Sequence, residues 1–323
     1  MHRVADGLSP ELEHALNDIT VQPDGCVARL AGRTVEGNGP RHLHGLLKAA
    51  LYEELHAGQR MATDKDPREL RDPAFESLLT AATPHRYATV RARLRQHLDG
   101  AVLVDLDGVL VRVPEGALLA DPPDDRRMVR LSLPSARPAI SPGFFLVDGS
   151  RGRSWSPPML RIYVHLEAAE AAPPAWAAAL RCLEDGGVRY RAKVCSTTDQ
   201  FPRRDALVVY LGADDRHVVS EVAASVSGLA GVGDRVSVFT EEVAPGVSVG
   251  WEPIDTKPST LSFGQHRATA VATGLIDHAM GTGQGSKAGV VAGALRDAGV
   301  DPTAPFRNLS SPPLHTRAAE PAT

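Results

Sequence analysis

Short apolar segments in the second half of the chain carry polar side chains at alternating positions. They read Arg161-Ile-Tyr163-Val-His165-Leu166, Tyr190-Arg-Ala-Lys193-Val194 and Arg203-Arg204-Asp205-Ala-Leu-Val-Val-Tyr210. A period of two predicts β-strands in which alternate side chains share a face, as Tyr163 and His165 would. Arg203 and Asp205 share a face for the same reason. The stretch 206–211 is apolar throughout, which is typical of a strand at the centre of a sheet.

Stretches with helical periodicity separate and follow these strands. Helices are expected at about 10–19, 42–58, 72–82, 174–183, 214–229, 263–280 and 287–298, and further strands at 101–113 (two, around an Asp-Gly turn), 128–133 and 143–147. The sequence predicts an α+β fold, with a helical and β-hairpin subdomain over 1–150 and an α/β domain over 151–300 built on a mixed or antiparallel sheet. The turn-rich stretch 240–261 is expected to be a long loop. The tail 301–323 is expected to be disordered.

The composition is that of a soluble globular chain. Of its 323 residues 43% are hydrophobic and the net charge is −4, and no apolar run approaches the ~18 residues that a membrane helix needs. The N-terminus has no signal-peptide pattern, and three scattered cysteines are too few for a disulfide framework or a structural zinc site. A cytoplasmic protein is expected. Nucleic-acid binding is not indicated, because no basic stripe with interleaved aromatic residues is present.

Lysine is rare in this chain, with five lysines beside 30 arginines. A lysine within an apolar strand, Lys193, is conspicuous in such a sequence because lysine can lose its proton and arginine cannot. A lysine acts as a base near neutral pH only where burial or nearby cations lower its pKa. Two interpretations stay open: a catalytic base, or a lysine that extends from a strand edge into solvent.

The order of the motifs resembles that of the lyase family related to the Hop-A type III effectors of plant pathogens. Members of that family stand alone in the biosynthetic clusters of class V lanthipeptides and thioamitides. The matching elements are Arg161-Ile162-Tyr163, Lys193-Val194, Phe201-Pro-Arg203-Arg-Asp205 with Val209-Tyr210, and Ala244-Pro245-Gly246 with Ser262-Phe-Gly-Gln-His266-Arg267. Leu51–Gly58 and Ser141–Phe145 look like further landmarks, so the resemblance covers most of residues 40–280.

The resemblance implies a phosphoserine/phosphothreonine lyase that acts on a ribosomally made precursor peptide. A separate kinase would phosphorylate the peptide, and elimination of phosphate would leave dehydroalanine or dehydrobutyrine for a possible cyclase subunit. Lys193 would remove the α-proton. The implied partners are therefore the phosphorylated peptide, the kinase and possibly the cyclase, and neither a metal nor an organic cofactor is implied.

The other polar residues of the motifs divide between proton transfer and phosphate binding. The candidates are Tyr163, His165 and His266 for the general acid, Arg203 with Arg267 and then Arg204 and Arg161 for the phosphate, and Asp205, Tyr210 and Ser262 in supporting positions. A guanidinium group matches phosphate oxygens with two parallel hydrogen bonds, which favours the arginines. Each residue also has a structural interpretation: a histidine bound to a backbone carbonyl, a solvated arginine, or a serine that caps a helix.

Two other classes of function fit parts of the sequence. A non-catalytic module that presents a peptide or phosphopeptide to a kinase explains the arginines but not Lys193. Asp105 and Asp107 stand in an Asp-x-Asp-Gly motif like that of haloacid-dehalogenase-like phosphatases, although the segment also reads as a hairpin turn. The glycine-rich stretch 281–287 lacks the Gly-Lys-Ser/Thr ending of a phosphate loop and is expected to be a linker.

Overall fold

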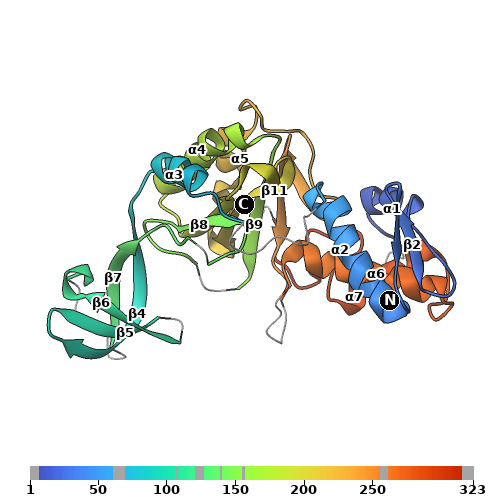
Figure 1. Ribbon diagram of the computed structural model, residues 1–323, viewed down its shortest axis with the longest axis horizontal. Coiled ribbons are helices and arrows are strands. Elements are labelled where there is room, and N and C mark those ends of the chain that lie inside the picture. Colours follow the sequence, from blue (N-terminus) through green and yellow to red (C-terminus); the bar gives the residue numbers. More distant parts are fainter. Residues whose placement is uncertain are drawn as a thin grey trace, which may run out of the picture.

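An antiparallel sheet of six strands forms the centre of the molecule (Figure 1). The computed structural model describes residues 7–60, 70–106, 108–120, 127–138, 140–154, 157–254 and 261–314. The strand order is β12-β13-β9-β11-β10-β8. The strands are β8 (Phe144–Asp148), β9 (Met159–Leu166), β10 (Tyr190–Cys195), β11 (Arg203–Gly212), β12 (Glu241–Ala244) and β13 (Val247–Trp251). The apolar strand β11 lies between β9 and β10, so its predicted central position is confirmed.

Helices from three parts of the sequence cover one face of this sheet (Figure 1). They are α3 (Pro73–Ala82), α4 (Ala172–Asp185) and α5 (Val219–Val226), the last preceded by the 3-10 helix η5 (Ala213–Val218). Trp176 of α4 is fully buried against the inward side chains of the sheet, among them Ile162 and Leu207. Because apolar burial is the main stabilising term in folding, this layer is the principal core.

The opposite face of the sheet is covered over only part of its area. Here lie α1 (Pro10–Asn17), α2 (Pro40–Leu51), the π-helix η1 (Tyr52–Ala57), α6 (Phe263–Ala279) and α7 (Lys287–Asp297), with a small sheet of β1 (Thr20–Val21), β2 (Val27–Leu30) and β3 (Arg33–Glu36). Their shared core includes Tyr163 of β9 and Val208 of β11. The α2–η1 helix ends at Gly58, whose φ of 73° suits a residue without a side chain.

A four-stranded antiparallel sheet extends from the opposite end of the central sheet (Figure 1). Its order is β6-β5-β4-β7, with β4 (Tyr87–Leu98), β5 (Ala101–Leu106), β6 (Val109–Pro114) and β7 (Met128–Pro134). A small apolar cluster of its own, which includes Val102 and Leu131, holds it together. The predicted hairpin over 101–113 is confirmed by the pairing of β5 with β6.

The α+β fold is confirmed, and three expectations about its organisation change. Strand β8 lies before residue 150 and pairs with β10, so the central sheet draws on both sides of the predicted boundary. The expected loop at 240–261 contains the hairpin of β12 and β13. The described part of the tail, 301–314, is packed: the carbonyl of Phe306 accepts a hydrogen bond from the backbone of Trp251 at 2.7 Å, and Ser311 is buried. None of the described helices is both long and apolar enough to cross a membrane.

Candidate functional site

The sheet register gathers the predicted residues of three strands on one face. Lys193 of β10 is paired with Val208 of β11, which in turn is paired with Tyr163 of β9. In the next row, Arg191 is paired with Tyr210, and Tyr210 with Arg161. Because paired residues point to the same side of a sheet, these side chains form two adjacent rows. Neighbouring strands lie about 4.8 Å apart, so each row spans roughly 10 Å.

Lys193 lies next to two aromatic rings on this face of the sheet. Its Nζ is 3.9 Å from the ring centroid of Phe144 and 6.0 Å from that of Tyr210, and the side chain is half-buried. Within the described residues, its ammonium group has no hydrogen-bond or ion-pair partner. Lys193 is therefore not a solvated edge lysine, and it presents a nitrogen beside aromatic rings without a neutralising carboxylate.

Two arginines flank Tyr210 in the second row. The Arg161 guanidinium lies 4.8 Å from the Tyr210 ring centroid and donates two hydrogen bonds to the Glu252 carboxylate. Arg191 donates two hydrogen bonds to Asp148, at 2.6 and 3.1 Å. Arg161 and Lys193 therefore lie near the Tyr210 ring, and Arg191 is the register neighbour of Tyr210 with its guanidinium on Asp148.

A buried network of polar side chains lies beside Lys193 and joins η1 to β11. Arg203 donates two hydrogen bonds to Asp205 and one to the Tyr52 hydroxyl at 2.9 Å, and Tyr52 donates to Asp205 at 2.9 Å. His56 completes the network: its Nε2 is 3.7 Å from Asp205, and its Nδ1 is 2.8 Å from the Ser237 hydroxyl. We call Tyr52, His56, Arg203, Asp205 and Ser237 the buried network.

The electrostatics of the buried network explain how charge is tolerated there. Burial alone would favour the neutral acid of Asp205, but the charge of Arg203 and the hydrogen bonds from Arg203 and Tyr52 outweigh burial and lower its pKa. Burial lowers the pKa of His56 to about 4, although the Asp205 carboxylate opposes this shift. The network thus holds one ion pair and a neutral histidine, and Arg203 is only 2% exposed.

The aromatic ring of Phe144 connects the two groups. The Arg203 guanidinium lies 5.2 Å from the centroid of Phe144, while Lys193 lies 3.9 Å from it. Arg203 is therefore placed to hold Phe144 and, through it, Lys193. Arg203 donates to Asp205 and Tyr52, so its described hydrogen bonds are made within the buried network, and its predicted role in phosphate binding stays a prediction.

The two acid candidates of β9 have different surroundings. Tyr163 is 2% exposed, and its hydroxyl has no hydrogen-bond partner among the described residues. Burial raises its pKa, so the phenol keeps its proton. The His165 ring lies against Gly233, where a Cβ would approach the ring Nδ1 to 2.2 Å, and that nitrogen accepts a hydrogen bond from the Arg235 backbone at 3.3 Å.

Four further candidates are not brought to Lys193. Arg267 is fully buried and donates to the carbonyl of Pro305 and the side chain of Asn308, so it anchors the tail, and its expected role in a phosphate clamp stays a prediction. His266 lines a hollow between α6 and α7. Ser262 and Gln265 form a capping box, which makes Ser262 a helix cap. Arg204 donates to the Glu54 carbonyl at 3.0 Å.

Several residues of the site were not singled out by sequence. Two of them are Arg191 and Glu252, which lie near Lys193 and Arg161 only because of the sheet register, whereas Phe144 stands in the Ser141–Phe145 landmark. Tyr52 and His56 did carry a signal, because both stand in the Leu51–Gly58 landmark at a spacing of four residues. On a helix that spacing puts two side chains on one face.

The Asp-x-Asp-Gly motif on which the phosphatase interpretation depends lies in the hairpin of β5 and β6, and only part of it is described. Asp105 lies on the exposed side of the hairpin, where it accepts hydrogen bonds from Arg95 at 2.5 Å and from the Gly108 backbone at 2.9 Å. Asp107 lies outside the described residues. Among those residues no cluster of three or more His, Cys, Asp or Glu side chains is arranged to hold a metal ion.

Three comparisons relate the chain to known proteins. No protein with a curated description matches the sequence. The structure is similar to that of the effector protein from Pseudomonas syringae pv. tomato strain DC3000, with 13% identity, a TM-score of 0.47 and coverage of 83% of this chain and 89% of that one. The effector protein from Pseudomonas syringae pv. syringae strain 61 gives 13%, 0.46, 82% and 97%. The model of the HopA1 effector protein family matches residues 135–307, more than half of the chain and nearly all of the central sheet. The chain therefore belongs to the HopA1 effector protein family.

Proposed function

We propose that the protein is a lyase that eliminates phosphate from phosphorylated serine or threonine of a peptide, giving dehydroalanine or dehydrobutyrine. One observation carries the proposal: the sheet register puts Lys193, Arg161, Arg191 and Tyr210 on one face of the sheet, with Arg161 and Lys193 near the Tyr210 ring. A base next to several guanidinium groups suits a substrate that carries an acidic proton and a phosphate on adjacent carbons. The motif resemblance described above supports the same chemistry.

Lys193 is the base in this proposal. Its neutral amine takes the α-proton of the phosphorylated residue, and the electrons of the Cα–H bond form the Cα=Cβ double bond. The Cβ–O bond breaks, and its electrons leave with the phosphate. The position of Lys193 beside the Phe144 and Tyr210 rings, with no carboxylate partner among the described residues, supports this role.

Arg161 and Arg191 receive the phosphate in this proposal. A guanidinium group has five N–H donors, and the contacts with Glu252 and Asp148 use two on each arginine, so donors remain for phosphate oxygens. Positive charge fixed in advance around the leaving group stabilises the negative charge that develops in the transition state. Arg191 takes the place that the sequence had suggested for Arg267.

Tyr163 is the preferred proton donor to the leaving phosphate. Its hydroxyl is buried without a described partner, and such groups in native structures usually meet a ligand or water. Burial keeps it protonated. His165 is the alternative donor, two residues further along the same strand and on the same face. The partners in this proposal are a phosphorylated precursor peptide, the kinase that supplies it, and a possible cyclase that uses the product.

The test is to incubate the purified protein with a synthetic phosphopeptide and to follow phosphate release and peptide mass, with and without a chelator. A lyase removes one phosphoric acid per site and leaves a product that reacts with thiols. A phosphatase restores the hydroxyl, and a binding module leaves the mass unchanged. Lys48→Ala, a change on the distant helix α2, is the matched control for variants of Lys193.

A further inference from the structure

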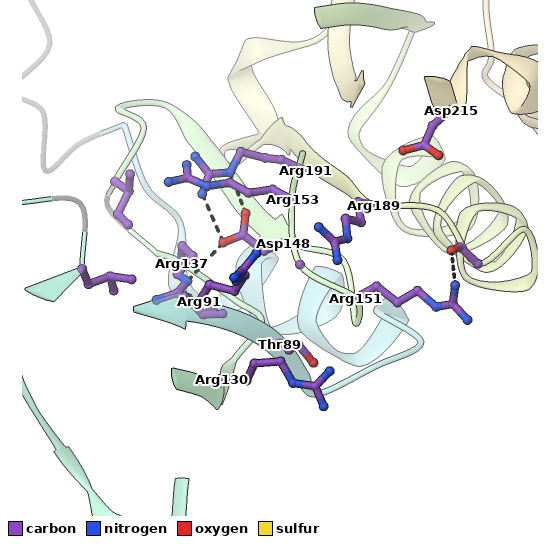
Figure 2. Close-up of a pocket in the computed structure, with 15 residues that line it drawn as sticks. Thr89, Arg91, Arg130, Arg137, Asp148, Arg151, Arg153, Arg189, Arg191 and Asp215 are labelled. Atoms are coloured by element: carbon purple, nitrogen blue, oxygen red, sulfur yellow. Dashed lines mark hydrogen bonds and ion pairs between the residues drawn. The ribbon is translucent and has the colours of Figure 1, made fainter. Parts of the chain in front are cut away.

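A second concentration of arginines lines a cavity of about 620 Å³ between the four-stranded sheet and the edge of the central sheet (Figure 2). Strands β4 and β7 form one wall. The end of β8, the turn that follows it, and the start of β10 form the other. Seven of the described lining residues are arginines, and only Asp148 and Asp215 are acidic. The cavity is therefore strongly positive, in a chain whose net charge is −4.

On each wall of the cavity, two arginines lie next to each other. Arg91 and Arg130 are directly paired in the β4–β7 ladder, so both side chains lie on the same face of this wall. On the other wall, Asp148 is shared by Arg191 at 2.6 Å and Arg137 at 3.5 Å, so one carboxylate serves two guanidinium groups. A bound anion would balance the excess charge around Asp148 on the second wall.

Arg189 is the cavity residue best placed to meet a ligand. It is exposed, and within the described part of the chain it forms no hydrogen bond or ion pair. Figure 2 shows its guanidinium in the middle of the cavity, among Arg151, Arg153 and Asp148. Arg151, beside it, donates to the Gly187 carbonyl at 2.7 Å.

The cavity is continuous with the proposed catalytic face. Arg189, Arg191 and Lys193 occupy alternate positions along β10 and the residue before it, so they point to the same side of the sheet. Four residues of an extended strand span about 13 Å. A peptide that binds with its reacting residue at Lys193 would reach the middle of the cavity about four residues further along its own chain.

We infer that this cavity binds an acidic segment of the peptide substrate, about four or more residues from the phosphorylated residue. The identity of the ligand as substrate rests on the proposed function. A peptide fits better than a nucleic acid, because none of the described lining residues is aromatic and single-stranded nucleic acids bind by stacking on aromatic rings. Val90, Leu106 and Ile140 instead provide apolar contacts among the arginines. The spread of arginines over both walls suits several carboxylates rather than one phosphate.

The test measures binding of a labelled, unphosphorylated peptide with a run of glutamates to the full-length protein. Its reference is the same peptide with glutamine in place of glutamate. Arg189→Glu is the cavity variant, and Arg181→Glu, an exposed position on α4 outside the cavity, is the control with the same change of charge. The wild type should prefer the glutamate peptide, and Arg189→Glu should weaken its binding about tenfold or more. Arg181→Glu should change binding less than twofold, because exposed charges further away than about 10 Å are screened.

Two competitors test the nature of the ligand. Pyrophosphate should displace the glutamate peptide only at much higher concentration, and a single-stranded oligonucleotide of equal charge should bind more weakly. Any one of four results would overturn the inference. They are equal binding of the glutamine peptide, an equal loss of affinity for the glutamate peptide in both variants, full competition by pyrophosphate, and tighter binding of the oligonucleotide.

Turnover separates this inference from the proposed function. Phosphopeptides with the glutamate run placed one, five or nine residues from the phosphorylated residue are compared in the wild type and in Arg189→Glu. A lyase with this cavity should favour the five-residue spacing, and Arg189→Glu should remove the preference. If the elimination rate does not depend on the glutamates, the inference about the cavity is wrong and the proposed lyase function is not affected. If the protein binds the glutamate peptide but eliminates no phosphate, the proposed lyase function is wrong and the inference about the cavity is not affected.

Discussion

Two polar clusters lie side by side on the same face of the central sheet and differ in how their charges are balanced. In the buried network, Arg203 and Asp205 form a bidentate pair that is almost fully buried, Tyr52 bonds to both, and His56 lies 3.7 Å from Asp205. Around Tyr210, Arg161 and Lys193 lie near a half-buried ring, Arg191 is its neighbour in the sheet register, and Lys193 has no carboxylate partner in the described structure.

The difference separates the residues that hold the site in place from the residues that we propose to act on the substrate. A buried pair whose donors and acceptors are satisfied holds two elements in one geometry, here η1 and β11, and offers nothing to a ligand. A half-exposed cluster with excess positive charge, in contrast, remains available to bind an anionic ligand. Phe144 joins the two clusters, so the buried network fixes the ring against which Lys193 lies.

The largest expected effect is on turnover. Lys193→Ala should slow elimination by about 10²–10⁴-fold while phosphopeptide affinity stays nearly normal, because a base acts on the α-proton and adds little ground-state binding. Lys193→Arg should be as slow, since arginine keeps its proton. Single-turnover rates and equilibrium binding measure the two quantities separately. Near-normal turnover in either variant would remove Lys193 from the mechanism.

A large effect on stability is expected from the buried network. Asp205→Asn leaves the Arg203 charge buried without a counter-charge, which costs about 3–5 kcal/mol of unfolding free energy. Urea unfolding measures this loss, and Asp99→Asn on an exposed turn is the control. An Asp205→Asn protein as stable as the control variant would show that the network does not hold η1 to the sheet.

Arg191 and Arg267 should give opposite signatures. Arg191→Ala should weaken phosphopeptide binding by about 2 kcal/mol, roughly thirtyfold, because it removes a charge-assisted contact with the phosphate. Arg267→Ala should lower thermal stability instead, because the Asn308 side chain and the Pro305 carbonyl lose a buried donor. Titrations with phosphorylated and unphosphorylated peptide, together with melting curves, measure both effects. A selective loss of phosphopeptide affinity in Arg267→Ala would restore the original assignment.

Acid should destabilise the protein through His56. Its pKa is 6.5 when unperturbed and about 4 in the fold, so the unfolded chain binds a proton that the folded protein excludes. The contribution of His56 to stability is therefore complete above pH 6.5 and declines as the pH falls towards 4, by about 1 kcal/mol per pH unit. His56→Gln should flatten this part of the pH profile of urea unfolding. An unchanged slope would place the proton uptake elsewhere.

The smallest effect is expected at the hairpin. Asp105→Asn removes a surface contact with Arg95 and should leave elimination within a few-fold of normal. Phosphate release assayed with and without magnesium provides the measurement. Complete loss of activity together with a magnesium requirement would instead favour the phosphatase interpretation.

Sequence periodicity predicted most of the architecture because the core elements bury one face. The helices and the strands around Lys193 alternate clearly between apolar and polar positions. Strand β4 was not predicted as a strand, because half of its exposed positions are arginines (Arg91, Arg93 and Arg95) and two of its three buried positions are alanines. The small sheet of β1, β2 and β3 was missed because its strands have only two to four residues.

The site could be predicted only in part, because spacing along the chain does not report distance in space. Lys193, Tyr163, Arg161 and Tyr210 were named from motifs and lie on one face. Arg267 stands in the same set of motifs but bonds to the tail, which no local pattern reveals. The contact of Tyr52 with Arg203 joins residues 151 positions apart, so it required the fold.

The central claim is that the open face around Lys193 breaks the Cα–H bond of a phosphorylated residue. A phosphothreonine peptide that carries deuterium at Cα tests it in one mass measurement. The account predicts that the wild-type product lacks both the phosphoric acid and the deuterium, that it forms more slowly than from the unlabelled peptide, and that Lys193→Arg yields almost none. A dephosphorylated product that retains its deuterium, or equal product from Lys193→Arg, would contradict the account.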